Sequence, residues 1–327
     1  MVKRLMTFRS PMARIGLVAI LGTFVAWTSL ILPTASAASG SHGHDTSTTI
    51  PLRYAPNGPT PTSSTTLPIG RGISYYLSLG DSVGMWDGTR SFPYLLADRY
   101  SHTSVPGLRL IDMSCSGETS ESMMKGSTCA PGGSQYDNAV SFVTAHRGHI
   151  ALITISIGGN DVVPCMSRPN AATCFENDLP TMKANISTIV AGLNTAAGPG
   201  VPIVGMNVYD PLLGDWLAPG TGRSLAAASI AGVGLLGKSM FQAYRAEATS
   251  VANVEGAYHS ADLTHFESSP WGRVPVAVAD ACTLLDIVCQ RGSLIGYGDD
   301  PNRAGAVVIA SAFAKAIGRL RPPKSDT

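Results

Sequence analysis

Residues 150–157 constrain the fold more than any other part of this sequence, because they form an almost uninterrupted apolar run. A strand with one face in water would alternate apolar and polar residues, so this segment must be covered on both faces. That is the pattern of a central strand in a parallel sheet, which needs helices on both of its sides. The run stops at Gly158-Gly159-Asn160-Asp161, a sequence typical of a turn.

Strand and helix patterns alternate on both sides of this run. Four more strands are expected at residues 73–79, 108–113, 201–209 and 252–258. Helices are expected at residues 91–100, 136–146, 179–197, 225–249 and 303–320, with a long irregular region between 259 and about 301. Short links between alternating elements predict an α/β fold of the flavodoxin-like, three-layer α/β/α type with a five-stranded parallel sheet. In such sheets, sites form beyond the carboxyl ends of the strands.

The first 37 residues have the pattern of an export signal. Four basic side chains lie among the first 14 residues, an uncharged apolar run follows at 15–32, and Ala35-Ser36-Ala37 forms a small-x-small cleavage site. We therefore expect a secreted or extracytoplasmic protein. If the segment is not cleaved, the protein is tethered to the membrane by it; otherwise no stable membrane partner is expected.

The residues between this signal and the first strand do not resemble a folded domain. Residues 38–71 are rich in Ser, Thr and Pro and predict a disordered linker, in which His42 and His44 are solvated. We expect the folded domain over residues 72–320 and a short tail at 321–327.

The six cysteines agree with an exported domain, because an even number in such a chain suggests disulfides. Six cysteines allow fifteen pairings, but here they fall along the chain as three local couples. The predicted bonds are Cys115 to Cys129, Cys165 to Cys174 and Cys282 to Cys289. The sequence has no C-x-x-C pair and no His at ligand spacing from a cysteine, so a metal site is not favoured.

The overall charge limits the class of partner. The 327 residues carry a formal net charge of +1, with no basic stripe or acidic tail. This argues against a nucleic-acid partner and favours a neutral or small molecule.

Gly80-Asp81-Ser82 follows the first strand directly. A serine on a sharp turn at the carboxyl end of a central strand is held toward solvent, where a nucleophile is useful. The same residues also fit a plain Gly turn with an Asp or Ser helix cap.

Similar residues end the next two strands. Ser116-Gly117 follows the second strand, and Asn160-Asp161 follows the third. Acyl transfer at Ser82 would need hydrogen-bond donors for the developing oxyanion. The backbone N–H groups of Ser82 and Gly117 and the side-chain amide of Asn160 could provide three. Each residue alone could be turn chemistry, but three successive strand ends together favour an acyl-transfer site.

With these blocks the chain resembles the SGNH (GDSL-type) hydrolases over about residues 72–320. Leu79–Ser82 is similar to the nucleophile block, Cys115–Gly117 to the glycine block and Ile157–Asp161 to the asparagine block. The nearest resemblance is to secreted bacterial esterases and lipases with three local disulfides. The resemblance implies a three-layer α/β fold and serine-dependent hydrolysis of small-molecule, lipid or glycan esters, without a metal or organic cofactor.

The fourth block of that family differs here. The family pattern is Asp-x-x-His-Pro, followed by Asn and Gly, just before the last helix. This chain has Pro301, Asn302 and Gly305 in that frame, but Asp300 stands at the His position and no His follows His265. A carboxylate titrates near 4 and an imidazole near 6.5, so Asp300 is a poor base unless burial raises its pKa strongly.

Three interpretations follow. In the first, His259 or His265 replaces the missing base. His259 is better placed because it follows the last predicted strand directly, but a surface-loop histidine is the ordinary interpretation of either residue. Alternatively Asp300 is itself the base, alone or paired with Asp299, although an N-cap of the last helix would also explain it. In the third, the protein is a catalytically weak or inactive relative that binds an ester, a glycan or a cell-envelope ligand.

Several other acidic, aromatic and histidine residues have expected structural roles or could line the site. Asp81 and Asp161 are expected to orient turns, and Trp86 could line the cleft or pack in the core or in a lid. The histidines on helices or their ends, His102, His146 and His149, are interpreted as structural. The sequence therefore predicts an exported serine esterase or lipase with Ser82, Gly117 and Asn160 in its site and an unusual base.

Overall fold

The structure is a computed structural model that describes residues 73–126, 129, 133–166, 171–287, 289 and 299–323. The predicted export signal and linker, with His42 and His44, lie outside the described residues. The domain boundaries drawn from the sequence therefore stay predictions.

A five-stranded parallel sheet in the order β2-β1-β3-β4-β5 organises the described residues. The strands are β1 Ser74–Gly80, β2 Leu108–Asp112, β3 Ile150–Ser156, β4 Ile203–Met206 and β5 Ser250–Ala252. Every residue of β1 and of β3 is buried. The expected parallel sheet, with its central strand at residues 150–157, is confirmed.

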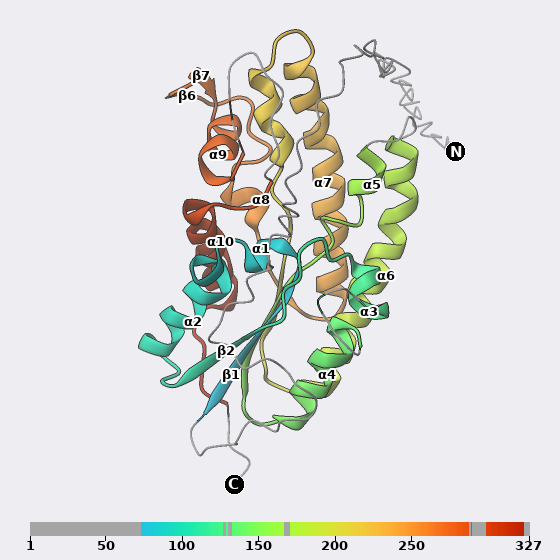
Figure 1. The fold of residues 1–327 in the computed structure, drawn as a ribbon, viewed down its shortest axis with the longest axis vertical. Coiled ribbons are helices and arrows are strands. Elements are labelled where there is room, and N and C mark those ends of the chain that lie inside the picture. Colours follow the sequence, from blue (N-terminus) through green and yellow to red (C-terminus); the bar gives the residue numbers. More distant parts are fainter. Residues whose placement is uncertain are drawn as a thin grey trace, which may run out of the picture. The chain divides into compact units, whose positions relative to one another are not determined.

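Helices cover both faces of the sheet, as the prediction of three layers requires (Figure 1). The five predicted helices are present as α2 Phe92–Thr103, α4 Gln135–Ala145, α6 Ala171–Ala197, α7 Gly222–Ala246 and α10 Arg303–Ile317. Tyr76 and Leu152 point toward α2 and α10, where Phe92 stacks on Phe313 at a centroid distance of 4.8 Å. Leu77 points to the opposite face, against α4, α6 and α7. Alternate residues of β1 thus enter two separate cores.

The end of the sheet differs from the prediction. A strand at 252–258 is wrong, because β5 stops at Ala252 and Val254–Ala257 forms the short helix α8. The Asn253 side chain caps this helix by accepting a 3.0 Å hydrogen bond from the N–H of Gly256. Asn is a strong N-cap, and its local bonds compete with continued strand pairing. His259 therefore follows a helix and not a strand.

The region from 259 to 301 is also more regular than expected. The antiparallel hairpin of β6 Phe266–Ser269 and β7 Gly272–Pro275 leads into α9 Val276–Leu284. The residues of β6 are mostly exposed and lack apolar alternation, so no strand pattern marks them. The remaining short elements are α1 Ser82–Met85, α3 Ser120–Lys125, α5 Val163–Met166 and the 3-10 helices η1 Gly88–Arg90 and η2 Pro211–Leu217.

Three disulfides join Cys115 to Cys129, Cys165 to Cys174 and Cys282 to Cys289, which confirms the predicted pairing. The partners are 14, 9 and 7 residues apart, so each bond closes a short loop beside the core. Disulfides of this kind persist in oxidising compartments and are typical of extracytoplasmic proteins.

Gly80 generates a prediction about the joint between sheet and site. Its φ is +146°, and a Cβ at this position would overlap the backbone carbonyl oxygen of Ser156. Gly80→Ala should lower the free energy of unfolding by about 2–5 kcal/mol, because strain and overlap act together. Urea unfolding monitored by circular dichroism measures this change.

The matched control is Gly220→Ala. Gly220 also has a positive φ, +69°, but nothing lies within 4 Å of a Cβ built there. Gly220→Ala should lower the free energy of unfolding only by the cost of a positive φ in a residue with a Cβ, about 1 kcal/mol. Equal losses in the two variants would contradict the close contact between Gly80 and Ser156.

Candidate active site

Ser82 leaves the sheet at the carboxyl end of β1 and begins α1. Asp81 caps this helix: its backbone N–H donates to the carbonyl of Ser156 at 3.0 Å, and its carboxylate accepts from the N–H of Val83 at 3.1 Å. Gly84 lies directly on Ser114, so that a Cβ there would overlap the Ser114 hydroxyl. The helix is therefore held close to the loop after β2, and Ser82 is half-buried at this junction.

The loops after β2 and β3 are bonded to each other. The Asn160 amide donates to the carbonyl of Glu118 at 3.0 Å. One residue further on, Asp161 accepts from the backbone N–H of Ser120 at 2.8 Å and also from its hydroxyl. Gly117 lies in the same loop, with a φ of +74° that favours glycine. The structure thus brings together Gly117 and Asn160, and Asp161 anchors α3 as well as orienting its own turn.

Gln135 and Glu118 form a buried polar pair that connects the end of β1 to this loop. The sequence did not predict this pair. Gln135 accepts from the N–H of Gly80 at 2.8 Å and donates to the Gly80 carbonyl at 3.0 Å. The same amide nitrogen lies 3.3 Å from the carboxylate of Glu118, which also accepts from the hydroxyl of Ser122. Both Gln135 and Glu118 are almost fully buried. Nothing in the sequence marks a Gln at the start of a helix as a partner of a distant glycine.

Two backbone donors are open at this junction. Within the described part of the chain, the N–H groups of Ser82 and Gly117 donate no hydrogen bond. The Asn160 amide uses one N–H for Glu118 and has a second. Preorganised donors of this kind are what the stabilisation of an oxyanion needs.

Asp300 is held by backbone pairing. Its carbonyl accepts from the N–H of Asp286 at 2.8 Å, and the N–H of Asn302 donates to the carbonyl of Leu284 at 3.0 Å. Tyr209 fixes the preceding residue, because its hydroxyl donates to the carbonyl of Asp299 at 2.7 Å. Asp300 is 8% exposed.

The alternative role of Asp300 as the cap of the last helix is wrong. Asn302 is the N-cap of α10, and its side chain accepts from the N–H groups of Ala304 and Gly305 at 2.9 and 3.2 Å. The Asp300 carboxylate is therefore not used by the helix.

The electrostatics of the junction depend on burial. Desolvation raises the pKa of Asp300 to about 6, with smaller contributions from the charges of Asp299 and Asp286. The Ser82 hydroxyl lies close enough to stabilise the Asp300 carboxylate, which partly opposes this rise. Burial raises the pKa of Asp81 to about 8, against the Val83 N–H and together with the charge of Asp300. Near pH 7, Asp300 is therefore mostly ionised and Asp81 mostly protonated.

The described histidines bond elsewhere. His259 binds Asp280 through Nδ1 at 2.7 Å, and its side chain is 56% exposed. It lines an open surface cavity of about 510 Å³ with Asn253, Glu255, Gly256, Ala261, Asp262 and Thr264, none of them a predicted site residue. His265 binds Asp262 at 2.7 Å. Neither alternative base is hydrogen-bonded to Ser82 in the described part of the chain.

The remaining predicted residues have structural places. His146 and His149 bind the backbone carbonyls of Phe142 and Ile73 at 2.8 and 3.1 Å, and His102 binds that of Asp98 at 2.8 Å. Trp86 is exposed one turn beyond Ser82, and its backbone N–H donates to the Ser82 carbonyl at 2.8 Å. It is thus not a core residue.

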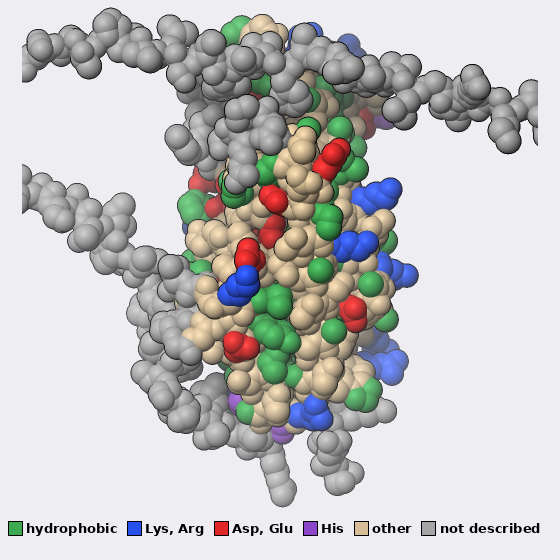
Figure 2. Space-filling model, turned by 90° about the vertical axis from the view of Figure 1, so that its right-hand side faces the viewer, with side chains coloured by type: hydrophobic (Ala, Val, Ile, Leu, Met, Phe, Trp, Pro, Cys, Tyr) green, Lys and Arg blue, Asp and Glu red, His purple; other side chains and the backbone are tan. Residues whose placement is uncertain are grey.

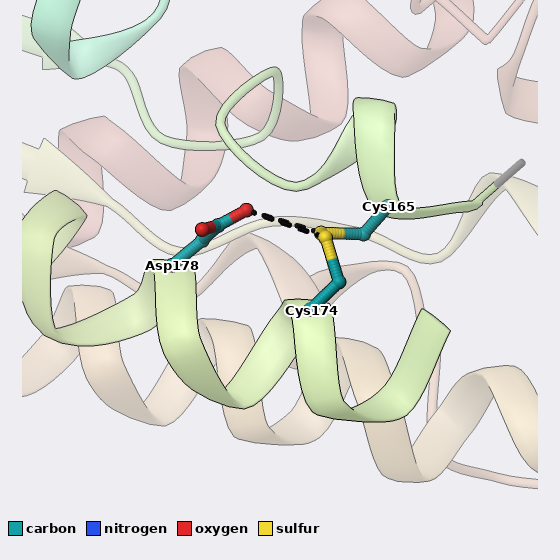
Figure 3. Close-up of side chains that lie close together, drawn as sticks. All are labelled: Cys165, Cys174 and Asp178. Carbon is teal, nitrogen blue, oxygen red and sulfur yellow. Dashed lines mark hydrogen bonds between the residues drawn. A yellow bond between two sulfur atoms is a disulfide. The ribbon is translucent and has the colours of Figure 1, made fainter. Parts of the chain in front are cut away.

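One group of side chains superficially resembles a metal site. The carboxylate of Asp178 lies 3.1 Å from the sulfur of Cys165 and 3.6 Å from that of Cys174 (Figure 3). Both sulfurs are in a disulfide, so neither is available as the thiolate that a metal ion would bind.

Comparison with known proteins gave one family match. A sequence model of the GDSL-like Lipase/Acylhydrolase family matches residues 78–256. A search of curated proteins gave no significant match.

Solved structures with a similar arrangement include three hydrolases. An alpha/beta hydrolase from the metagenome of Lake Arreo is 18% identical, with 76% of this chain and 96% of that chain covered and a TM-score of 0.48. Phospholipase A1 from Streptomyces albidoflavus is 14% identical, with 75% and 99% covered and a TM-score of 0.49. An extracellular lipase from Streptomyces rimosus is 17% identical, with 75% and 100% covered and a TM-score of 0.42.

The buried carboxyls predict how stability depends on pH. The pKa of Asp300 is raised to about 6 on folding, so the folded state binds this proton more tightly than the unfolded state. Its stabilising effect is complete below about pH 4 and is lost as the pH rises through 6. The Asp300→Asn variant cannot ionise at this position, so it does not lose this stability as the pH rises. Relative to the parent, the variant should gain about 2–3 kcal/mol between pH 4 and pH 8. Denaturant unfolding of both proteins at the two pH values measures this difference; an offset that is the same at both would contradict the raised pKa.

Proposed function

Because the chain belongs to the GDSL-like Lipase/Acylhydrolase family, we propose that it is an exported hydrolase of ester bonds, with Ser82 as its nucleophile and Asp300 as its general base. The observation that carries this proposal is the buried Asp300 carboxylate beside the Ser82 hydroxyl, with a pKa raised to about 6. A base with this pKa is ionised at neutral pH and still holds a proton well enough to return it. Those are the two properties for which enzymes ordinarily use imidazole.

The acylation step follows from this arrangement. The Ser82 Oγ attacks the ester carbonyl carbon while its proton passes to the Asp300 carboxylate. The carbonyl oxygen becomes an oxyanion, which the N–H groups of Ser82 and Gly117 and the amide of Asn160 stabilise. When the intermediate collapses, Asp300 returns the proton to the departing alcohol, and the acyl group remains on Ser82.

Deacylation repeats the step with water. Asp300, ionised again, takes a proton from a water molecule that attacks the acyl-Ser82 carbonyl. The second intermediate uses the same three donors, and its collapse releases the carboxylic acid and returns the proton to Ser82 Oγ. No metal ion or organic cofactor takes part in these steps. The substrate class is a small-molecule, lipid or glycan ester.

The sequence around Asp300 supports a carboxylate that acts alone. In the Asp-x-x-His pattern that the chain resembles, the Asp orients the imidazole, and here Tyr297 holds that position. Both members of the His–Asp pair are thus replaced. A carboxylate base held by backbone pairing has no need of an orienting acid.

The alternative function is a catalytically weak or inactive relative that binds an ester, a glycan or a cell-envelope ligand. What favours it is that no described histidine contacts Ser82. In that case the parent protein would neither turn over short-chain aryl esters nor react with a fluorophosphonate, although the domain is folded.

A labelling and turnover experiment tests the proposed nucleophile and base. The parent should hydrolyse a short-chain aryl ester and take up a fluorophosphonate, and Ser82→Ala should lose both. Asp300→Asn should lower kcat at least about 100-fold, the smaller end of the effect of general-base catalysis. His259→Ala is the matched control and should change kcat less than twofold. Turnover that survives Ser82→Ala, or depends on His259, would contradict the proposal.

The pH dependence gives an independent test. Because Asp300 must be ionised to act as base and its pKa is about 6, kcat/KM should rise through an apparent pKa near 6 and level off above it. Asp300→His should keep measurable activity with an apparent pKa characteristic of imidazole. A profile that is flat from pH 5 to 8 in the parent would exclude Asp300 as the base.

Removal of the side-chain oxyanion donor should act on kcat. Asn160→Ala should lower kcat about 100- to 1,000-fold with little effect on KM, because the amide acts on the transition state. Asn185→Ala is a control, since Asn185 donates to the nearby Ser120 hydroxyl at 3.0 Å and lies outside the proposed hole. Comparable kcat losses in both variants would show that Asn160 only supports the loop.

A further inference from the structure

Helix α7 presents an apolar stripe to solvent. Its outer face consists of Ala227, Ala231, Leu235, Lys238, Phe241 and Arg245, which recur every three or four residues and are all exposed. Leu235 is 51% exposed and Phe241 48%, among the highest values for large apolar side chains in the described part of the chain. Scattered apolar residues need no explanation, but here Leu235 and Phe241 lie on one helix face with two alanines, on either side of Lys238.

The opposite side of α7 is fixed in the core. Leu236, Met240 and Tyr244 are buried, and Tyr244 lies directly against Gly205 of β4. Of the described helices, α7 is the one long and apolar enough to span a membrane. Spanning would withdraw Tyr244 and its neighbours from the core. Only the outer face of α7 is therefore available for contact with another surface.

The charges of α7 have one sign. Its 25 residues include Arg223, Lys238 and Arg245 and no Asp or Glu. Within the described residues none of the three has an acidic partner, and Arg223 lies 5.3 Å from the centroid of Trp216. Lys183 of α6 adds a fourth cation beside the helix, through a 3.0 Å bond to Gln242.

Figure 2 shows the side of the molecule on which α6 lies: Lys and Arg side chains gather along one edge, with hydrophobic side chains beside them. The outer face of α7 therefore combines Phe and Leu with Lys and Arg, which are residue types of helices that bind in the plane of a lipid surface. At 1.5 Å per residue, the stripe from Ala227 to Arg245 is about 27 Å long, long enough to contact many headgroups.

We propose that the outer face of α7 docks reversibly on an anionic lipid surface. The apolar side chains enter the boundary between headgroups and acyl chains, and the cations contact the negative charges. This contact is separate from any anchoring by residues 15–32, and it does not depend on the proposed hydrolase activity. It would hold the exported domain at a membrane.

The first test is vesicle flotation of the full chain. Binding to vesicles of equal phosphatidylcholine and phosphatidylglycerol should exceed binding to pure phosphatidylcholine and should weaken in high salt. Leu235→Glu should weaken the anionic-vesicle binding at least tenfold, and Lys238→Ala about fivefold, the effect expected of one cation. Val307→Glu is the matched control: Val307 is 48% exposed on α10, and its substitution should change binding less than twofold.

The second test reads the contact locally, whatever residues 15–32 contribute. All six cysteines are in disulfides, so Leu235→Cys or Val307→Cys adds a single thiol for a nitroxide label. On anionic vesicles, the label at 235 should lose access to a water-soluble relaxing agent while the label at 307 keeps it.

Equal access at positions 235 and 307 would overturn the proposal, even for a chain anchored by its N-terminus. So would equal vesicle binding of the Leu235→Glu and Val307→Glu variants. If Leu235→Glu instead converts a dimer to a monomer in light scattering and leaves lipid binding unchanged, the outer face contacts a second copy. Unchanged melting temperatures would show that the substitutions leave the fold intact, as expected at exposed positions.

Discussion

The pairing of β1 on both of its edges is the interaction on which the rest of the molecule depends. β1 is bonded to β2 on one side and to β3 on the other, both parallel, and all of its residues are buried. Parallel strands that are paired in register end at the same edge of the sheet, so the loops bearing Ser82, Gly117 and Asn160 leave it together. The bonding continues past the strand: the Gly80 carbonyl accepts from the N–H of Cys115 at 2.9 Å and from Gln135. The position of Ser82 is thus set by backbone bonds of the sheet.

Much of the sheet, and the edge at which a site was expected, could be predicted because both depend on patterns that are local in the sequence. The apolar run at 150–157 predicted a doubly covered strand, and the turn residues after three strands predicted where a site would form. The β5–α8 boundary could not be predicted by the same means, since it depends on whether Asn253 caps a helix or continues a strand. Gln135 and Glu118 lie outside such reasoning altogether. Their role depends on contacts across 55 and 17 residues of chain, which no local pattern encodes.

The environment of Asp300 shows why a residue type can mislead when its surroundings are unknown. From the sequence, an Asp at a position expected to hold His is a base too weak for neutral pH. In the structure this carboxyl is buried, has Asp299, Asp286 and Asp81 among its neighbours, and has a pKa of about 6. No described Lys or Arg forms an ion pair with it. Burial and the neighbouring negative charges both raise the pKa of Asp300. Neither effect can be inferred from the residue types alone.

Asp81 is part of the reason that Asp300 carries the charge. Two carboxyls this close do not both ionise easily near neutral pH, and the one in the less solvated place keeps its proton. Asp81 is the more perturbed of the two, with a pKa of about 8, and as a helix cap it accepts the Val83 N–H. Asp300 therefore ionises first, beside the Ser82 hydroxyl. What the proposed reaction needs is a proton acceptor at that place with a pKa just below neutral, and here burial supplies the pKa that imidazole has by its own chemistry. The arrangement lowers the stability of the folded state above pH 6, which is a reason to expect such carboxyls at a functional site and not elsewhere in a core.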